Sequence, residues 1–197
     1  MIVTVSGEIG AGKSTVARLL ARSLGLRYLS AGDVFREEAR RRAVSLAALG
    51  RMAEQDAAID RALDEFQIEA ARAGDILVDS RLSGWLIDGD LRIWLRAPFA
   101  VRVERVAARD GLDPDTAARE VRAREESERR RYREIYHIDL ADLARYHLVV
   151  DTGLWQPEHL ADALLHLART VRPDRSVPPH RPVDSHSCGA TGSGRSP

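Results

Sequence analysis

The stretch GEIGAGKST, residues 7–15, decides the fold. It fits the pattern Gly-x-x-x-x-Gly-Lys-Ser/Thr through Gly7, Gly12, Lys13 and Ser14. The glycines let the backbone curl so that its N–H groups point at a phosphate, and the helix that follows adds its positive end. An apolar run precedes the stretch at residues 2–5, and helical spacing follows it. This strand, loop and helix order favours a phosphate-binding loop over a fortuitous glycine turn.

Lys13 is the only lysine of the chain, and every other basic residue is arginine. A compact ammonium can donate to the β- and γ-phosphate oxygens from within such a loop, whereas a planar guanidinium needs more room. Ser14 is predicted to place its hydroxyl on Mg²⁺. We therefore expect the donor nucleotide to contact Gly7, Glu8, Ile9, Gly10, Ala11, Gly12, Lys13, Ser14 and Thr15.

Composition limits the possible partners. The chain has 197 residues, 44% of them apolar, which suits one soluble domain of ordinary size. Thirty acidic and 30 basic residues balance, so no global field favours a nucleic acid, and the substrates should be small. Apolar runs fall short of the roughly 20 residues that cross a bilayer. We expect a cytoplasmic monomer with no membrane and no nucleic-acid partner.

Strand and helix patterns alternate along the chain. Strands are expected at residues 2–5, 27–30, 76–79, 91–95 and 147–150. Between them lie segments of helical period, with apolar stripes at Ile59, Leu63, Phe66 and Ala70 and at Leu160, Leu164, Leu167 and Val171. This order predicts an α/β fold, a five-stranded parallel sheet between two helical layers. Residues 173–197, rich in Pro, Gly, Ser and His, are predicted to be a disordered tail.

The residues after the third strand separate the classes of phosphate-binding proteins. A GTP switch normally carries an Asn-Lys-x-Asp motif, but the chain has no asparagine and no second lysine. Hydrolytic motors usually have Asp-Glu after this strand, whereas here Asp79 is followed by Ser80. Asp79 can still hold Mg²⁺ or its water shell, because strand ends face the ligand crevice. The class that remains is an enzyme that transfers a phosphoryl group to an acceptor other than water.

Several arginines can supply positive charge to such a transfer. Asp33 is expected to cap a helix that carries Arg36, and Arg81 follows the third strand. Both guanidiniums can converge on one anionic acceptor, although Arg36 alone also suits a solvated face. Trp85 suits either stacking on a base or the core.

A long polar segment is predicted to form a lid, about residues 110–135. Asp113 and Pro114 mark a helix start. Arg124, Glu128 and Arg131 share one face of this helix over about 10 Å, so the glutamate can orient both guanidiniums. Arg105 and Arg109 also lie one turn apart. The alternative is an exposed helix with surface salt bridges. A closing lid would exclude water and deliver charge.

Five segments together resemble the archaeal-type cytidylate kinases of the nucleoside monophosphate kinase family: the phosphate-binding loop, SAGDVFR, DSRLSGW, REESERRRYREIYHID and VVDTGLW. The resemblance covers about residues 1–171. It implies a P-loop NTPase fold with a kinase domain at residues 1–172, a monophosphate-binding insertion at about 33–74 and a short arginine lid. It also implies ATP and Mg²⁺ as cofactors and conversion of CMP or dCMP to its diphosphate.

The resemblance also implies roles for individual residues. Arg36 and Arg81 would hold the acceptor phosphate, and Ser30 and Asp33 would shape its pocket. The transferring phosphoryl group would be neutralised by Arg105, Arg109, Arg124 and Arg131, beside Lys13. Glu8 departs from the small residues usual in this loop, so we expect somewhat weaker nucleotide binding. Two alternatives stay open: a kinase of another acceptor, and a nucleotide-binding regulatory protein.

Overall fold

A computed structural model describes residues 1–171. The predicted disordered tail at residues 173–197 lies outside the described residues. The sheet has five strands in the order β2-β3-β1-β4-β5, all parallel, as predicted. Their bounds are β1 Ile2–Gly7, β2 Arg27–Ser30, β3 Ile76–Asp79, β4 Leu91–Arg96 and β5 Leu148–Asp151. The last of these begins and ends one residue later than predicted.

The register of the strands brings the candidate site to one edge of the sheet. Val5 pairs with Asp79, Ser30 pairs with Asp79, and Gly7 pairs with Leu95. All five strands are parallel, so their carboxyl ends lie together. The residues that follow each strand therefore converge there, as the strand ends of open α/β sheets do.

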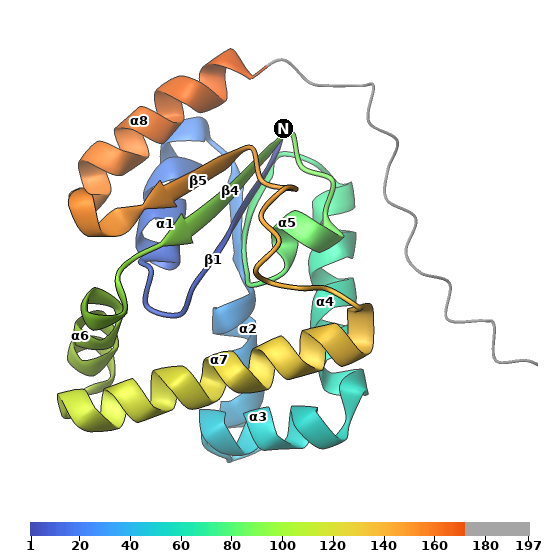
Figure 1. Ribbon diagram of the computed structural model, residues 1–197. Helices are drawn as coiled ribbons and strands as arrows, with labels where there is room; N and C mark the ends of the chain where they lie inside the picture. Colours follow the sequence, from blue (N-terminus) through green and yellow to red (C-terminus); the bar gives the residue numbers. More distant parts are fainter. Residues whose placement is uncertain (172–197) are drawn as a thin grey trace, which may run out of the picture.

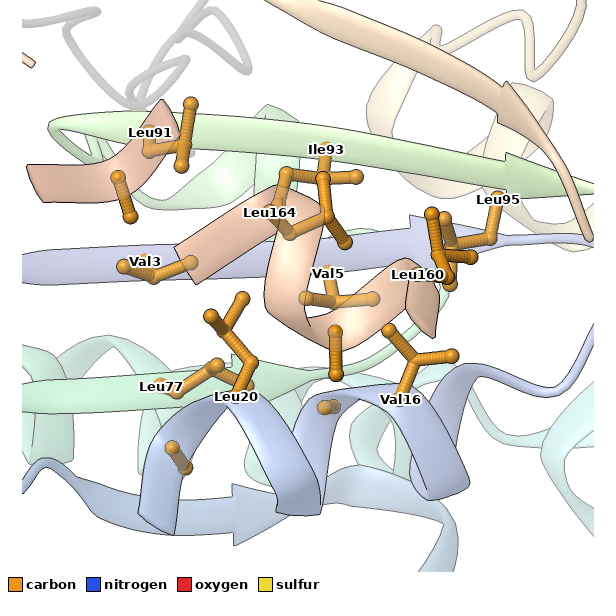
Figure 2. Close-up of a cluster of buried hydrophobic side chains, with 14 of the residues drawn as sticks. Val3, Val5, Val16, Leu20, Leu77, Leu91, Ile93, Leu95, Leu160 and Leu164 are labelled. Carbon is orange, nitrogen blue, oxygen red and sulfur yellow. The ribbon is translucent and has the colours of Figure 1, made fainter. Parts of the chain in front are cut away.

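Two helices cover one face of the sheet, α1 at Lys13–Leu24 and α8 at Pro157–Thr170. Figure 2 shows how side chains of both helices meet those of β1, β3 and β4 in the main core. Leu167 is 44% exposed, so the apolar stripe predicted for α8 is wrong at this position, whereas Val171, just after the helix, packs against the core. Ala161 and Ala168 complete the buried face instead.

The helices α2 (Ala31–Arg41), α3 (Leu46–Gln55), α4 (Ala57–Arg72) and α5 (Ser83–Leu86) follow β2 and β3. A second core cluster, formed by residues of α4, β3 and the α5 end, covers the opposite face of the sheet. The helix α2 begins earlier than expected. Its N-cap is Ser30, whose hydroxyl accepts from the backbone N–H of Asp33, so the prediction of Asp33 as the cap is wrong.

The remaining elements are α6 at Phe99–Asp110, α7 at Pro114–Tyr136 and the short 3₁₀ helix η1 at Thr152–Leu154. The N-cap of α7 is Asp113, with proline at its start, as predicted. Figure 1 shows α7 lying across the molecule below the sheet, from α6 at one end toward α4 at the other. No helix among residues 1–171 is both long enough and apolar enough to cross a membrane.

Helix α4 buries a different face from the one that its apolar stripe predicts. Phe66, in that stripe, is 52% exposed. The buried residues are instead Asp60, Asp64, Gln67 and Ala71. They follow one another at spacings of four, three and four residues, which is one face of a helix. A mostly polar face therefore points into the molecule.

Candidate functional site

The phosphate-binding loop joins β1 to α1, and the Lys13 side chain forms hydrogen bonds with its backbone. Its ammonium donates to the carbonyl oxygens of Gly7 at 3.1 Å and Glu8 at 2.8 Å. Gly10 and Gly12 have φ of +79° and +78°, a conformation that glycine adopts without strain. Burial and the neighbouring Arg81 guanidinium lower the pKa of Lys13 to about 8. The ammonium is thus mostly charged near neutral pH, and a bound anion would keep it so.

A hydroxyl and a carboxylate lie together at the end of β3. Oγ of Ser14 donates to Oδ2 of Asp79 at 2.6 Å, and the Tyr28 hydroxyl donates to the same oxygen at 3.0 Å. Mg²⁺ takes oxygen ligands, usually one or two from the protein together with phosphate and water. The predicted pair is therefore brought together and its chemistry fits Mg²⁺. Tyr28 was missed, because nothing in its local sequence indicates that it reaches Asp79.

Arg81 lies between the loop and α7. Its guanidinium donates to the carbonyl oxygen of Gly7 and, through Nε, to Oε2 of Glu128 at 2.5 Å. Burial opposes ionisation of Glu128, but the positive charges of Arg81 and Arg124 outweigh it and hold the pKa of Glu128 below its usual value. The sequence suggested that Glu128 orients Arg124 and Arg131. In the structure its hydrogen-bond partner is Arg81, and Arg131 donates to Asp60.

A cavity of about 300 Å³ opens beside these groups. It falls at the lower end of the size range typical of small-molecule sites. Most residues predicted for the two substrates line it together: Ile9, Gly10, Lys13, Ser14, Ser30, Arg36, Asp79, Arg81, Arg109, Arg124 and Arg131. One cavity thus joins the phosphate-binding loop to the residues expected to hold the acceptor.

Two of the residues predicted to bind the acceptor lie outside the lining of this cavity. Asp33 accepts from Arg18 at 2.8 Å and also from Arg36, so it anchors the guanidinium that does line the cavity. Trp85 packs against a cluster of buried side chains around Leu82 and Tyr132, with the Arg145 guanidinium 5.4 Å from its ring centroid. Of its two suggested roles, the core role agrees with this position.

A second cavity, of about 440 Å³, also borders the phosphate-binding loop. Gly12, Thr15, Arg105 and Arg109, four of the residues predicted to contact the donor, line it together. Arg105 is anchored by Thr152, to whose hydroxyl it donates at 2.8 Å, and this hydroxyl donates to the carbonyl oxygen of Ala11 at 2.9 Å. Trp155, 56% exposed, also lines the cavity. Thr152 and Trp155 were not predicted as site residues, although both lie in the VVDTGLW motif.

The inward face of α4 also reaches the first cavity. Asp60, Asp64 and Gln67 line it together with Arg131 of α7. No apolar periodicity marks these residues, because the apolar stripe on α4 lies one position away from them.

Comparison with solved structures supports the fold. A shikimate kinase from Bacteroides thetaiotaomicron superposes with a TM-score of 0.58, at 14% identity, over 86% of this chain and 98% of its own. An uncharacterised protein from Eubacterium ventriosum reaches 0.63 at 15% identity, over 86% and 99%. At such low identity the likeness concerns the fold, a parallel sheet with the phosphate-binding loop after β1.

Sequence relatives are more specific. The cytidylate kinase of Methanothrix thermoacetophila is 42% identical over 87% of this chain and 100% of its own length. That of Haloquadratum walsbyi is 46% identical over 83% and 87%. That of Halobacterium salinarum is 43% identical over 91% and 95%. Residues 2–154, which span the loop, the cavity and α7, match the family described as cytidylate kinase-like, and the chain therefore belongs to the cytidylate kinase-like family.

Proposed function

We propose that the protein transfers the γ-phosphoryl group of ATP to CMP or dCMP, giving ADP and the corresponding diphosphate. The observation that carries the proposal is family membership over residues 2–154, which include the phosphate-binding loop and the charged cavity beside it. A phosphate oxygen of CMP attacks the γ-phosphorus while the bond to the β,γ-bridging oxygen breaks. Little covalent chemistry is left to the protein, so it acts by positioning and by charge.

The donor is held by the loop. Its N–H groups and the Lys13 ammonium contact the β- and γ-phosphates, and they stabilise the charge that shifts toward ADP. Arg105 and Arg109 line the second cavity and contact the donor from the other side. Mg²⁺, when bound, would neutralise part of the negative charge of the donor phosphates. Ser14 and Asp79 would hold it or its water shell, since their oxygens already lie 2.6 Å apart.

The acceptor occupies the first cavity, in the insertion at about residues 33–74. Arg36 and Arg81 hold its phosphate, with Ser30 at the pocket wall and Asp33 fixing Arg36. Arg124 of α7, the proposed lid element, brings further charge to the phosphoryl group in transfer. Arg131 was predicted for the same role, but its guanidinium pairs with the buried carboxylate of Asp60. The proposal includes a monomer that acts on small nucleotides in the cytoplasm. Residues of one chain form the lining of both cavities, so neither cavity requires a second copy of the protein.

A coupled assay of ADP release tests the proposal. CMP, dCMP, UMP, AMP, GMP and no acceptor are compared at one ATP concentration. We expect CMP and dCMP to give the fastest release, and Lys13→Ala to abolish it. Faster release with another acceptor would assign a different kinase. If no acceptor accelerates release above the rate without acceptor, the kinase assignment fails, and ATP binding without turnover would favour the regulatory alternative.

A further inference from the structure

The inward face of α4 is unusual because it is built of polar side chains. Asp60 is 4% exposed, Asp64 8% and Gln67 1%. A helix face this buried is normally apolar, because burying polar groups costs free energy unless they are paired. All three residues line the cavity that Lys13 and Arg81 also line. The polar face therefore points at the space that the acceptor would occupy.

The buried polar side chains on the inward face of α4 differ in their hydrogen-bond partners. Asp60 is neutralised by Arg131, whose guanidinium donates to it at 2.7 Å. Asp64 has neutral hydrogen-bond donors instead: the Tyr136 hydroxyl at 2.7 Å and Nε2 of Gln67 at 3.0 Å. Among the buried side-chain atoms of the described residues that have no hydrogen-bond partner are two that belong to this part of the cavity, Oε1 of Gln67 and Nε of Arg131. One is an acceptor and the other a donor.

The helix α7 relates this polar face to the phosphate end of the cavity. Glu128 of α7 contacts Arg81 at the phosphate-binding loop, while Tyr136, eight residues later, contacts Asp64. Eight residues of helix advance about 12 Å. A nucleoside monophosphate with its phosphate at Arg81 and Arg36 can place its base near α4 across such a span.

Resting on the proposed function, we propose that Asp64, together with Gln67, recognises the exocyclic amino group of cytosine and is the residue that selects CMP over UMP. Cytosine presents an N4 amino donor, and uracil presents the O4 carbonyl acceptor in the same place. A carboxylate oxygen of Asp64 and Oε1 of Gln67 accept from the amino group. Nε of Arg131 donates to the ring acceptors of cytosine. With uracil, O4 faces acceptors only, and buried groups stay unpaired.

Asp64→Asn tests the assignment, because it keeps the shape and replaces one acceptor oxygen by a donor. We compare kcat/KM for CMP and UMP. The CMP:UMP ratio is expected to fall about tenfold or more, since hydrogen bonds to charged groups contribute on this scale. Most of the change should appear as a rise in the KM for CMP. A ratio within about twofold of the wild-type value, or equal losses for both nucleotides, would overturn the proposal.

Glu65→Gln is the matched control. Glu65 is the next residue on α4, it is exposed, and the substitution removes the same charge outside the cavity. We expect it to leave the ratio unchanged. If the wild-type protein phosphorylates no nucleotide, the proposed function fails. If the wild type prefers CMP and Asp64→Asn does too, only the role of Asp64 fails.

The wild-type protein provides a second test should Asp64→Asn not fold. Burial raises the pKa of Asp64 to about 7, against the hydrogen bonds from Tyr136 and Gln67 and the charge of Arg131, with Asp60 adding to the rise. An ionised Asp64 favours CMP. Calorimetric affinities for CMP and UMP are compared between about pH 5.5 and 8.5, a range that brackets this pKa. The phosphate titration common to both ligands cancels in their ratio. We expect the ratio to rise with pH through about 7, and a flat ratio would contradict the proposal.

Discussion

Arg81 and Glu128 form an ion pair that connects the phosphate-binding loop to α7. Nε of Arg81 lies 2.5 Å from Oε2 of Glu128, and the side chains are 14% and 12% exposed. The same guanidinium donates to the carbonyl oxygen of Gly7. The helix that carries Arg124 and Arg131 is therefore positioned from the loop that would hold ATP.

Removing the carboxylate of the Arg81–Glu128 pair should destabilise the folded protein. Glu128→Gln is expected to lower the free energy of unfolding by about 3 kcal/mol, because it leaves a buried guanidinium uncompensated. Bound ATP would supply negative charge near Arg81. Urea unfolding should therefore show a larger stabilisation by ATP in the variant than in the wild type at the same free ATP concentration.

Glu126→Gln is the control for this effect. Glu126 lies on the same helix, it is 69% exposed and it pairs with Arg129 at 3.3 Å. Exposed pairs of this kind contribute little, so the free energy of unfolding should change by less than about 0.5 kcal/mol. Equal losses in the two variants would mean that the Arg81–Glu128 pair has no special role.

The lowered pKa of Lys13 predicts how ATP binding depends on pH. The amine loses its proton as the pH rises through about 8 in the free protein. The charged form binds phosphate, so ATP affinity should fall between about pH 8 and 9.5, with proton uptake on binding. Fluorescence titration with a nucleotide analogue measures this. Lys13→Met should bind weakly at every pH in this range, and a similar slope in that variant would contradict the assignment.

Much of the fold follows from local patterns. The strands at residues 27–30 and 76–79 have the predicted bounds, because their apolar runs are short and end at polar or glycine residues. The order of strands and helices then leaves few arrangements besides a parallel sheet. The sequence does not show which side of α4 faces inward. The inward face of α4 lines the first cavity, so the orientation of this helix does not follow the usual rule that the apolar face is buried.

The residues at the phosphate end of the site could be predicted from the sequence, whereas the contacts that α7 makes could not. The phosphate-binding loop is contiguous, and its spacing alone brings Lys13 and Ser14 to one point. Asp79 follows from its place at a strand end. Glu128 with Arg81, Asp60 with Arg131 and Tyr136 with Asp64 are pairs from distant segments. Their meeting depends on how α7 crosses the molecule, which no local pattern specifies.

Glu8 is the residue for which the structure changes the expectation most. Its carboxylate lies 3.1 Å from Nε of Arg102 and accepts from the backbone N–H of Ala97 at 3.1 Å. Arg102 is buried and also donates to Glu125 of α7 at 2.6 Å. The charge of Glu8 is therefore compensated by a neighbouring arginine, which argues against the weaker nucleotide binding that the sequence suggests.

Glu8→Gln should then act on stability more than on nucleotide affinity. We expect the KM for ATP to stay within about twofold, and the free energy of unfolding to fall by about 1 kcal/mol through the weakened contact with Arg102. Steady-state kinetics and urea unfolding measure the two quantities. ATP binding that becomes several-fold tighter would show that the carboxylate repels the phosphates after all.

Gly7 fixes the start of the phosphate-binding loop against β4. Its φ is +146°, and a Cβ there would lie 2.0 Å from the carbonyl oxygen of Leu95, which accepts from the backbone N–H of Glu8 at 3.0 Å. Backbone cannot move aside as a flexible side chain can. Gly7→Ala should therefore separate β1 from β4 at this point and displace the loop.

Gly25→Ala provides the comparison, because Gly25 also has positive φ, +67°, but a Cβ there would meet open space. That variant carries the strain of a left-handed alanine, about 1–2 kcal/mol, and should bind ATP normally. Gly7→Ala should lose more unfolding free energy and most of its ATP affinity. If both variants lose similar stability and both bind ATP, the close approach of Gly7 to Leu95 does not control the loop.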